Sequence, residues 1–181
     1  LPNLLPFIDR KEMASISNLT YAPVIQASVG FKNTGTLRFN AFGGLVPSKE
    51  KKKILGILFP SACFEGRAPE EGALFSFFMG GTKQQDLLQQ SDEVLINLIR
   101  EELHLMLGFQ KEIEPDLLKI FRHHRAITQY ELNSGKRFET IEKLEKQYPG
   151  LHIAGNLKGG IGMADRIRQA TQLGLTLAKK E

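Results

Sequence analysis

The chain has 181 residues, enough for one domain or slightly more, and 41% of them are hydrophobic, so a sizeable core can form. Its formal net charge is +4, but residues 1–60 carry +5, residues 61–110 carry −5 and residues 111–181 carry +4. These alternating blocks argue against a nucleic-acid partner, which would need one continuous basic face. No apolar run approaches the roughly 20 residues that span a bilayer. We therefore expect a cytoplasmic protein without a signal peptide, and leave peripheral membrane attachment open.

The first half of the chain predicts strands. Their apolar and β-branched composition, bounded by glycine and proline turns, supports this interpretation. The charged run Ser48–Lys53 is interpreted as a solvated hairpin tip, with a basic anion patch as the alternative. Cys63, the only cysteine, is expected to be a buried small hydrophobe and cannot form an intrachain disulfide. The expected strands are Ala22–Phe31, Phe42–Pro47, Ile54–Pro60 and Ala73–Gly81, the last apolar on both faces and hence central in the sheet.

The second half mixes helices and extended segments. A helix is predicted from the N-cap Ser91 to Gly108, because apolar residues recur at helical spacing and Asp92 complements the helix dipole. Asp116–Tyr130 is expected to be extended. A helix over residues 134–148, a short strand Leu151–Ala154 and a helix Ile161–Lys179 complete the chain. The predicted fold is α+β, with a mixed, largely antiparallel sheet that has helices on one side, and a closing strand–helix in another layer.

The glycine-rich stretch "GNLKGGIG" (residues 155–162) precedes the last helix. It is neither a Walker A loop nor a dinucleotide fingerprint, because Ile161 and Gly162 replace Lys and Ser/Thr, and Asp165 replaces the third glycine. The glycines can serve the turn alone. Alternatively, N–H groups of Ile161, Gly162 and Met163 at the helix start can face the partly negative edge of a flavin.

Two further groups of residues have open interpretations. His123 and His124 are neighbours on an expected strand and point to opposite faces, so they do not suit one metal ion and are interpreted as structural or surface histidines. No other metal site is expected. The apolar stripe that includes Phe75, Phe77, Phe78 and Met79 ends at a glycine pair, and is interpreted either as core or as the wall of a pocket for a large flat ligand.

Four motifs in order carry a family resemblance: "FGGLVPSKEKKKILGILF", "ALFSFFMGG", "RAITQYELN" and "LHIAGNLKGGIGMADRI". Together they resemble the carboxy-terminal part of the FAD-dependent protoporphyrinogen oxidases, a family of amine-oxidase-like flavoproteins. The resemblance covers essentially all 181 residues. Two positions depart from it: Thr128 stands where the family has Pro before Gln-Tyr, and Arg166 where it has Cys. The family's amino-terminal GxGxxG motif does not occur, so we expect a fragment.

The resemblance implies that the complete protein oxidises protoporphyrinogen IX in haem biosynthesis, with hydride transfer to FAD and oxygen as the final acceptor. It implies a substrate-binding domain over residues 1–148 and the closing strand–helix of an FAD-binding domain over residues 149–181. Its motif positions assign FAD contacts to Ile161, Gly162 and Met163. They assign substrate contacts to five apolar residues: Phe42, Leu45, Leu58, Met79 and Ile127. The catalytic residues stay unassigned.

Two alternatives stay open at this point. A similar flavoenzyme could oxidise coproporphyrinogen III, which needs polar groups for two extra carboxylates. In a different class, the chain could be a non-enzymatic module that binds an anionic partner through its basic ends. The expected partners are the porphyrinogen, oxygen and the amino-terminal part of the same protein, and homo-oligomerisation is left open.

Overall fold

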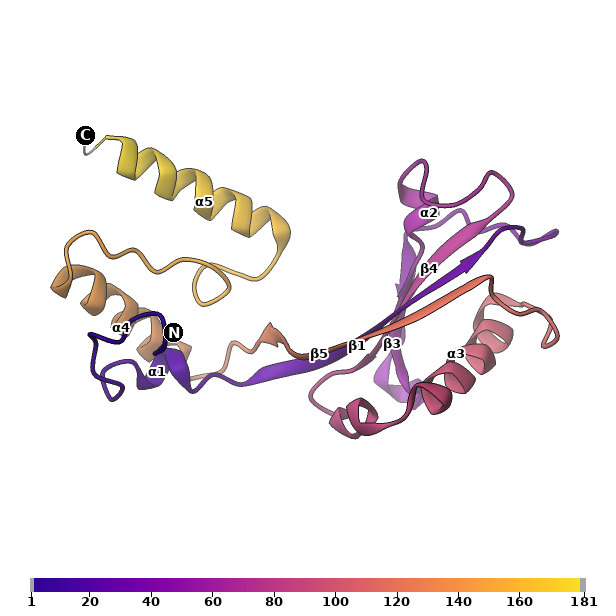
Figure 1. Ribbon diagram of the computed structural model, residues 1–181, viewed down its shortest axis with the longest axis horizontal. Coiled ribbons are helices and arrows are strands. Elements are labelled where there is room, and N and C mark those ends of the chain that lie inside the picture. Colours follow the sequence, from indigo (N-terminus) through magenta and orange to yellow (C-terminus); the bar gives the residue numbers. More distant parts are fainter. Residues whose placement is uncertain (1, 180–181) are drawn as a thin grey trace. The chain divides into compact units, whose positions relative to one another are not determined.

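The computed structural model describes residues 2–179 (Figure 1). Strands dominate up to Gly80, and helices and strands alternate afterwards, which confirms the predicted α+β class. The strands are β1 (Tyr21–Phe31), β2 (Gly43–Leu45), β3 (Ile54–Leu58), β4 (Ala73–Gly80) and β5 (Leu117–Thr128). The helices are α1 (Ala14–Ser17), α2 (Pro60–Cys63), α3 (Asp92–Leu107), α4 (Ser134–Gln147) and α5 (Met163–Ala178), with short 3-10 turns at Ser48–Glu50 and Gln85–Gln89.

The chain divides into two compact units. We call Ala22–Ala126 the sheet unit, and Leu1–Tyr21 together with Ile127–Glu181 the glycine-turn unit. The second unit is therefore built from both ends of the chain. These units do not coincide with the expected functional ranges 1–148 and 149–181. The reason is that α1, near the amino-terminal end, packs against α4 in the carboxy-terminal part of the chain. The functional ranges stay a prediction.

The five strands form one sheet in the order β2-β3-β4-β1-β5. The pairs β2–β3, β3–β4 and β4–β1 are antiparallel, as expected. Strand β4 lies in the interior of the sheet, which fits its apolar sequence. The charged run after β2 forms the expected hairpin tip, where Lys51 ends the 3-10 turn in the left-handed conformation with φ of 53°.

One face of the sheet packs against α3 (Figure 1). Alternate residues of β1 and β4, among them Ile25, Val29, Phe75 and Phe77, are buried there with the α3 residue Ile99. The helix has the predicted ends: the Ser91 hydroxyl accepts a hydrogen bond from the Val94 N–H, and Gly108 is left-handed with φ of 77°. Strand side chains alternate between the two faces of a sheet, so the remaining residues of β1 and β4 lie on the face that α3 does not cover.

The glycine-turn unit has a smaller core. Ile8, Met13 and Ile16 pack against Ile141 and Leu144 of α4. Two local expectations are corrected here and in the sheet unit. Leu151–Ala154 is not a strand: it has no ladder with another strand among residues 2–179, and the Ile153 N–H instead donates to the Glu145 carboxylate at 2.7 Å. Cys63 is exposed, because the four-residue helix α2 buries none of its side chains.

Within residues 2–179, no helix combines the length and the apolar character that a bilayer crossing requires.

Candidate functional site: an open sheet face and a glycine turn

The sheet face opposite α3 carries a band of half-buried and exposed side chains. The cross-strand register aligns Leu45 with Gly56, Gly56 with Phe78, and Phe78 with Gln26. Gly56 has no room for a side chain, because a Cβ there would lie 2.6 Å from the Gly44 carbonyl oxygen. The next row aligns Leu58 with a serine on β4. This face, which we call the open face, therefore has no side chain at Gly56 and has the apolar side chain of Leu45 on the hairpin side.

A polar group lies within the open face. The Gln26 side-chain amide donates to the hydroxyl of Ser28 at 2.9 Å and to that of Ser76 at 3.3 Å. Both N–H bonds of the amide are thereby used, so the carbonyl oxygen Oε1 is the part of Gln26 that can accept from a ligand. No sequence motif indicates this group. Only the strand register, which brings residues 26 and 76 to the same face, reveals it.

The structure corrects one predicted substrate contact. Met79 is fully buried in the core on the α3 side, opposite Ile25 and Ile54. Its neighbour Phe78, which the motif positions did not assign to the substrate, lies on the open face and is half-buried. The physical reason is the two-residue period of a strand: a shift of one position moves a side chain to the other face.

The other predicted substrate contacts lie at accessible positions. Leu45 and Phe42 have exposed fractions of 86% and 70%, and Leu58 is half-buried on β3. Leu45 and Leu58 therefore lie on or beside the open face, as a wall for an apolar ligand requires. Ile127, with an exposed fraction of 39%, belongs to the glycine-turn unit.

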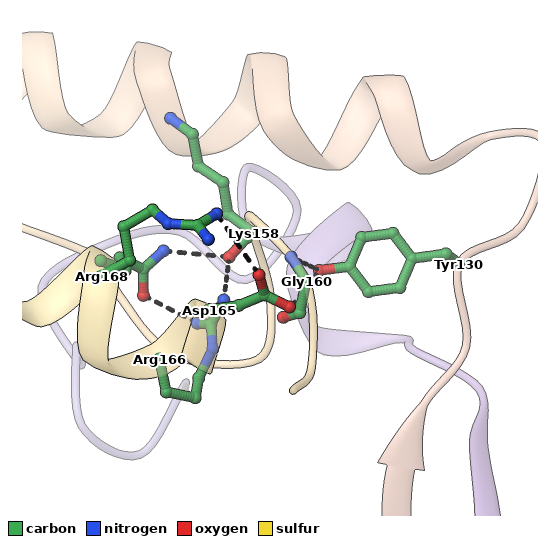
Figure 2. Close-up of polar contacts among 7 residues, drawn as sticks. Tyr130, Lys158, Gly160, Asp165, Arg166 and Arg168 are labelled. Carbon is green, nitrogen blue, oxygen red and sulfur yellow. Dashed lines mark hydrogen bonds and ion pairs between the residues drawn. The ribbon is translucent and has the colours of Figure 1, made fainter. Parts of the chain in front are cut away.

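The glycine turn between Gly155 and Gly162 has a backbone that depends on glycine. Gly155, Gly159 and Gly160 have φ values of 106°, 76° and 97°, in the region that disfavours L side chains. A Cβ on Gly160 would also overlap with the Asp165 carboxylate. Figure 2 shows Tyr130 pointing toward this turn, where its hydroxyl accepts a hydrogen bond from the Gly160 N–H at 3.1 Å.

Side chains of α5 hold the turn from the other direction (Figure 2). The Arg166 guanidinium donates to the carbonyl oxygens of Lys158, at 2.9 Å, and of Gly155. Gln169 donates to the same Lys158 carbonyl at 2.9 Å and accepts from the Gly155 N–H at 2.8 Å. Arg166, where the resembled family has Cys, thus satisfies carbonyl groups of the turn.

The start of α5 can face a flat ligand. Its N-cap is Gly162, which supplies no capping side chain, so N–H groups of the first turn are left for another acceptor. Ile161 and Met163 flank this position with exposed fractions of 46% and 83%. Donors from a helix start between apolar side chains fit the partly negative edge of a flavin ring. The residues present therefore fit the flavin end of FAD, and the chain has no GxGxxG motif that would hold its pyrophosphate.

The histidine pair does not form a metal site. His123 and His124 are both exposed on β5, and no group of three metal-ligating side chains occurs within residues 2–179. They are surface residues, one of the two roles expected for them.

Comparison with known proteins identifies the family of the chain. The model of the flavin-containing amine oxidoreductases matches residues 1–165. The chain is 34% identical to the mitochondrial protoporphyrinogen oxidase of Nicotiana tabacum over 82% of its own length and 30% of that protein's. It is 23% identical to the coproporphyrinogen III oxidase of Bacillus subtilis over 87% of its length and 33% of that protein's.

A solved structure has the same fold. It comes from Exiguobacterium sp. 255-15, is provisionally named a protoporphyrinogen oxidase, and superposes with a TM-score of 0.76 at 20% identity. The superposition covers 99% of this chain and 39% of that one. The chain thus spans about a third of the length of its curated relatives.

Proposed function

The chain belongs to the flavin-containing amine oxidoreductases, and from that premise we propose that it forms the substrate-binding sheet and the flavin-facing turn of an FAD-dependent oxidase of protoporphyrinogen IX. The observation that carries the proposal is the open face, where apolar side chains surround a polar group on a sheet whose other face is filled by α3. A large, flat and mostly apolar substrate needs such a surface.

Porphyrinogen chemistry matches the open face in two respects. The macrocycle is apolar over most of its area, so Leu45, Leu58 and Phe78 can bury it. Its four pyrrole N–H groups are donors, and the Gln26 carbonyl oxygen is an acceptor on the same face. These residues bind and orient the substrate, and none of them has to exchange a proton.

The residues at the start of α5 would contact the cofactor. N–H groups of the first turn and the side chains of Ile161 and Met163 would hold one edge of the flavin. When bound, the flavin supplies the oxidising equivalents by accepting hydride from the substrate, and oxygen reoxidises it. The task of this chain is therefore to fix the two partners, which agrees with the lack of an acid–base motif in the sequence.

The 181-residue chain by itself is expected neither to retain FAD nor to oxidise a porphyrinogen. Dinucleotides are held largely by phosphate contacts at a glycine-rich helix start, and the sequence has no motif of that kind. We expect activity only from the complete protein, because this chain covers about a third of the length of its curated relatives.

The test uses the product of the complete reading frame, purified in air. We expect a yellow protein that converts protoporphyrinogen IX to fluorescent protoporphyrin IX and forms hydrogen peroxide. The matched control is the 181-residue chain mixed with FAD, which should stay colourless after desalting. A protein that binds no flavin, or binds flavin and leaves every porphyrinogen unchanged, would refute the proposal.

Coproporphyrinogen III is a second candidate substrate, favoured by the similarity to the Bacillus subtilis enzyme of that name. It carries two more carboxylates than protoporphyrinogen IX. Exposed cationic side chains on β5, such as Lys119, could pair with them. The ratio of kcat/KM values for the two substrates, measured on one preparation, decides between them.

A further inference from the structure

We propose that Tyr130 is a positioning residue for the flavin: its hydroxyl fixes the glycine turn, and the turn aims the N–H groups at the start of α5. The inference deepens the proposed function and rests on it. Neither the family match nor the relatives' names assign a role to this residue.

The contact is made to both backbone polar groups of one left-handed glycine. The Tyr130 hydroxyl accepts from the Gly160 N–H at 3.1 Å (Figure 2). Its own proton is shared between the carbonyl oxygens of Asn156 at 3.3 Å and Gly160 at 3.4 Å. Gly160 has a φ of 97°, so its peptide orientation is not one that the chain adopts by default. A hydroxyl that both accepts and donates here selects that orientation.

The tyrosine ring is itself held in place. The guanidinium of Arg137 lies 4.5 Å from the centre of the Tyr130 ring and 5.3 Å from that of Phe138. Arg137 is 2% exposed and is held mainly by these rings, with one long hydrogen bond of 3.4 Å to the Gln129 carbonyl. Desolvation strengthens a cation–π contact, so α4 supplies a rigid platform for the tyrosine.

The position of Gly160 gives the contact its consequence. Gly160 precedes Gly162, the N-cap of α5, by two residues, and Ile161 lies between them. Arg166 and Gln169 tie the turn to α5, whereas Tyr130 ties it to the segment that follows β5. Loss of the hydroxyl would leave the turn attached to its own helix and free to rotate with it. The donors at the helix start would then lose their fixed direction toward the flavin.

The experiment replaces Tyr130 by Phe in the flavin-loaded product of the complete reading frame. Tyr130→Phe keeps the ring on Arg137 and removes only the hydroxyl. We expect the Kd for FAD to rise about three- to tenfold, which is the usual worth of one hydrogen bond. We also expect a shifted flavin absorption spectrum and faster hydrogen exchange over residues 155–162. The matched control is Tyr148→Phe, whose hydroxyl accepts from the Gln147 side chain and which should change none of these.

The outcomes separate the inference from the proposed function. Faster exchange in the turn with unchanged flavin affinity and spectrum would make Tyr130 a local structural residue and overturn the inference alone. A wild-type protein that binds no flavin would overturn the proposed function and the inference with it. Unchanged exchange in Tyr130→Phe would show that the hydroxyl does not hold the turn, and would also overturn the inference.

Discussion

The sheet unit and the glycine-turn unit are held together by different interactions. In the sheet unit, sixteen buried apolar residues form one continuous core between the sheet and α3. Among the described residues of the glycine-turn unit the buried cluster has six members, and α5 buries none of its side chains. The turn before α5 is instead fixed by hydrogen bonds from Tyr130, Arg166 and Gln169.

The two units obtain a defined structure in different ways. A packed core tolerates little change of volume, so it keeps the sheet, and with it the open face, in one shape. In the other unit, a few hydrogen bonds and left-handed glycines fix the turn, and the N–H groups at the start of α5 are left for a ligand. The sheet unit is thus stabilised mainly by apolar burial and the turn mainly by hydrogen bonds. Variants in the two units should therefore differ in their effect on stability.

The largest expected effect is on the sheet core. Phe75 is fully buried, and its ring contacts four others. Phe75→Ala should lower the free energy of unfolding by about 3–5 kcal/mol, through lost burial and the cavity left behind. Ile167→Ala in α5 is the counterpart, and with an exposed fraction of 65% it should cost less than about 0.5 kcal/mol. Urea unfolding of the chain measures both, and equal losses would contradict the distinction between the units.

A somewhat smaller effect separates the two faces of β4. Met79→Ala should destabilise the sheet unit by about 4 kcal/mol, because Met79 is in the core. Phe78→Ala, one residue away on the open face, should largely keep the melting temperature and raise KM for protoporphyrinogen IX about tenfold, equivalent to about 1.4 kcal/mol. Melting temperature, flavin content and KM are measured on the same preparations of the complete protein. A raised KM in Met79→Ala with normal stability would restore Met79 to the substrate site.

The two units also contain ion pairs of different burial. Lys52 and Glu102 are 2.7 Å apart in the sheet unit, where the Glu102 side chain is 9% exposed. Lys52→Met should cost about 3 kcal/mol, since it leaves a buried carboxylate unpaired. The pair Lys158–Glu142, at 3.6 Å in the glycine-turn unit, is exposed, and Lys158→Met should cost less than about 1 kcal/mol. The double variant Lys52→Met with Glu102→Leu should recover most of the loss, and failure to do so would point to a role in packing instead.

The smallest expected effects concern two glycines near and within α5. Gly160→Ala should loosen the turn by about 2 kcal/mol, because the residue is left-handed and a Cβ would meet Asp165. Gly174→Ala, at an open position inside α5, should stabilise that helix by about 0.5–1 kcal/mol. Hydrogen exchange over residues 155–178 reports both. Changes of the same sign would mean that the turn does not depend on the glycine conformation.

Sequence patterns predicted most of the sheet unit correctly. The apolar composition of β1 and β4 and the caps Ser91 and Gly108 are local signals, and each element lies at its expected place. The substrate contact predicted for Met79 was wrong, because the sequence of a strand that is apolar on both faces does not show which of its residues face the core. The Gln26 group and Tyr130 were missed because each depends on a contact between distant parts of the chain. The strand predicted over Leu151–Ala154 was wrong, because a strand needs a neighbouring strand to pair with, and four residues do not show whether one is present.

The chain crosses from one unit to the other twice, once at the start of β1 and once near the end of β5, and these two strands are neighbours in the sheet. The sheet unit is therefore an insertion whose two ends leave from adjacent positions. Insertion of a domain is tolerated best where its two ends lie close together. A lineage could thus replace Ala22–Ala126, and with it the open face, while it inherits the Tyr130–Gly160 contact unchanged.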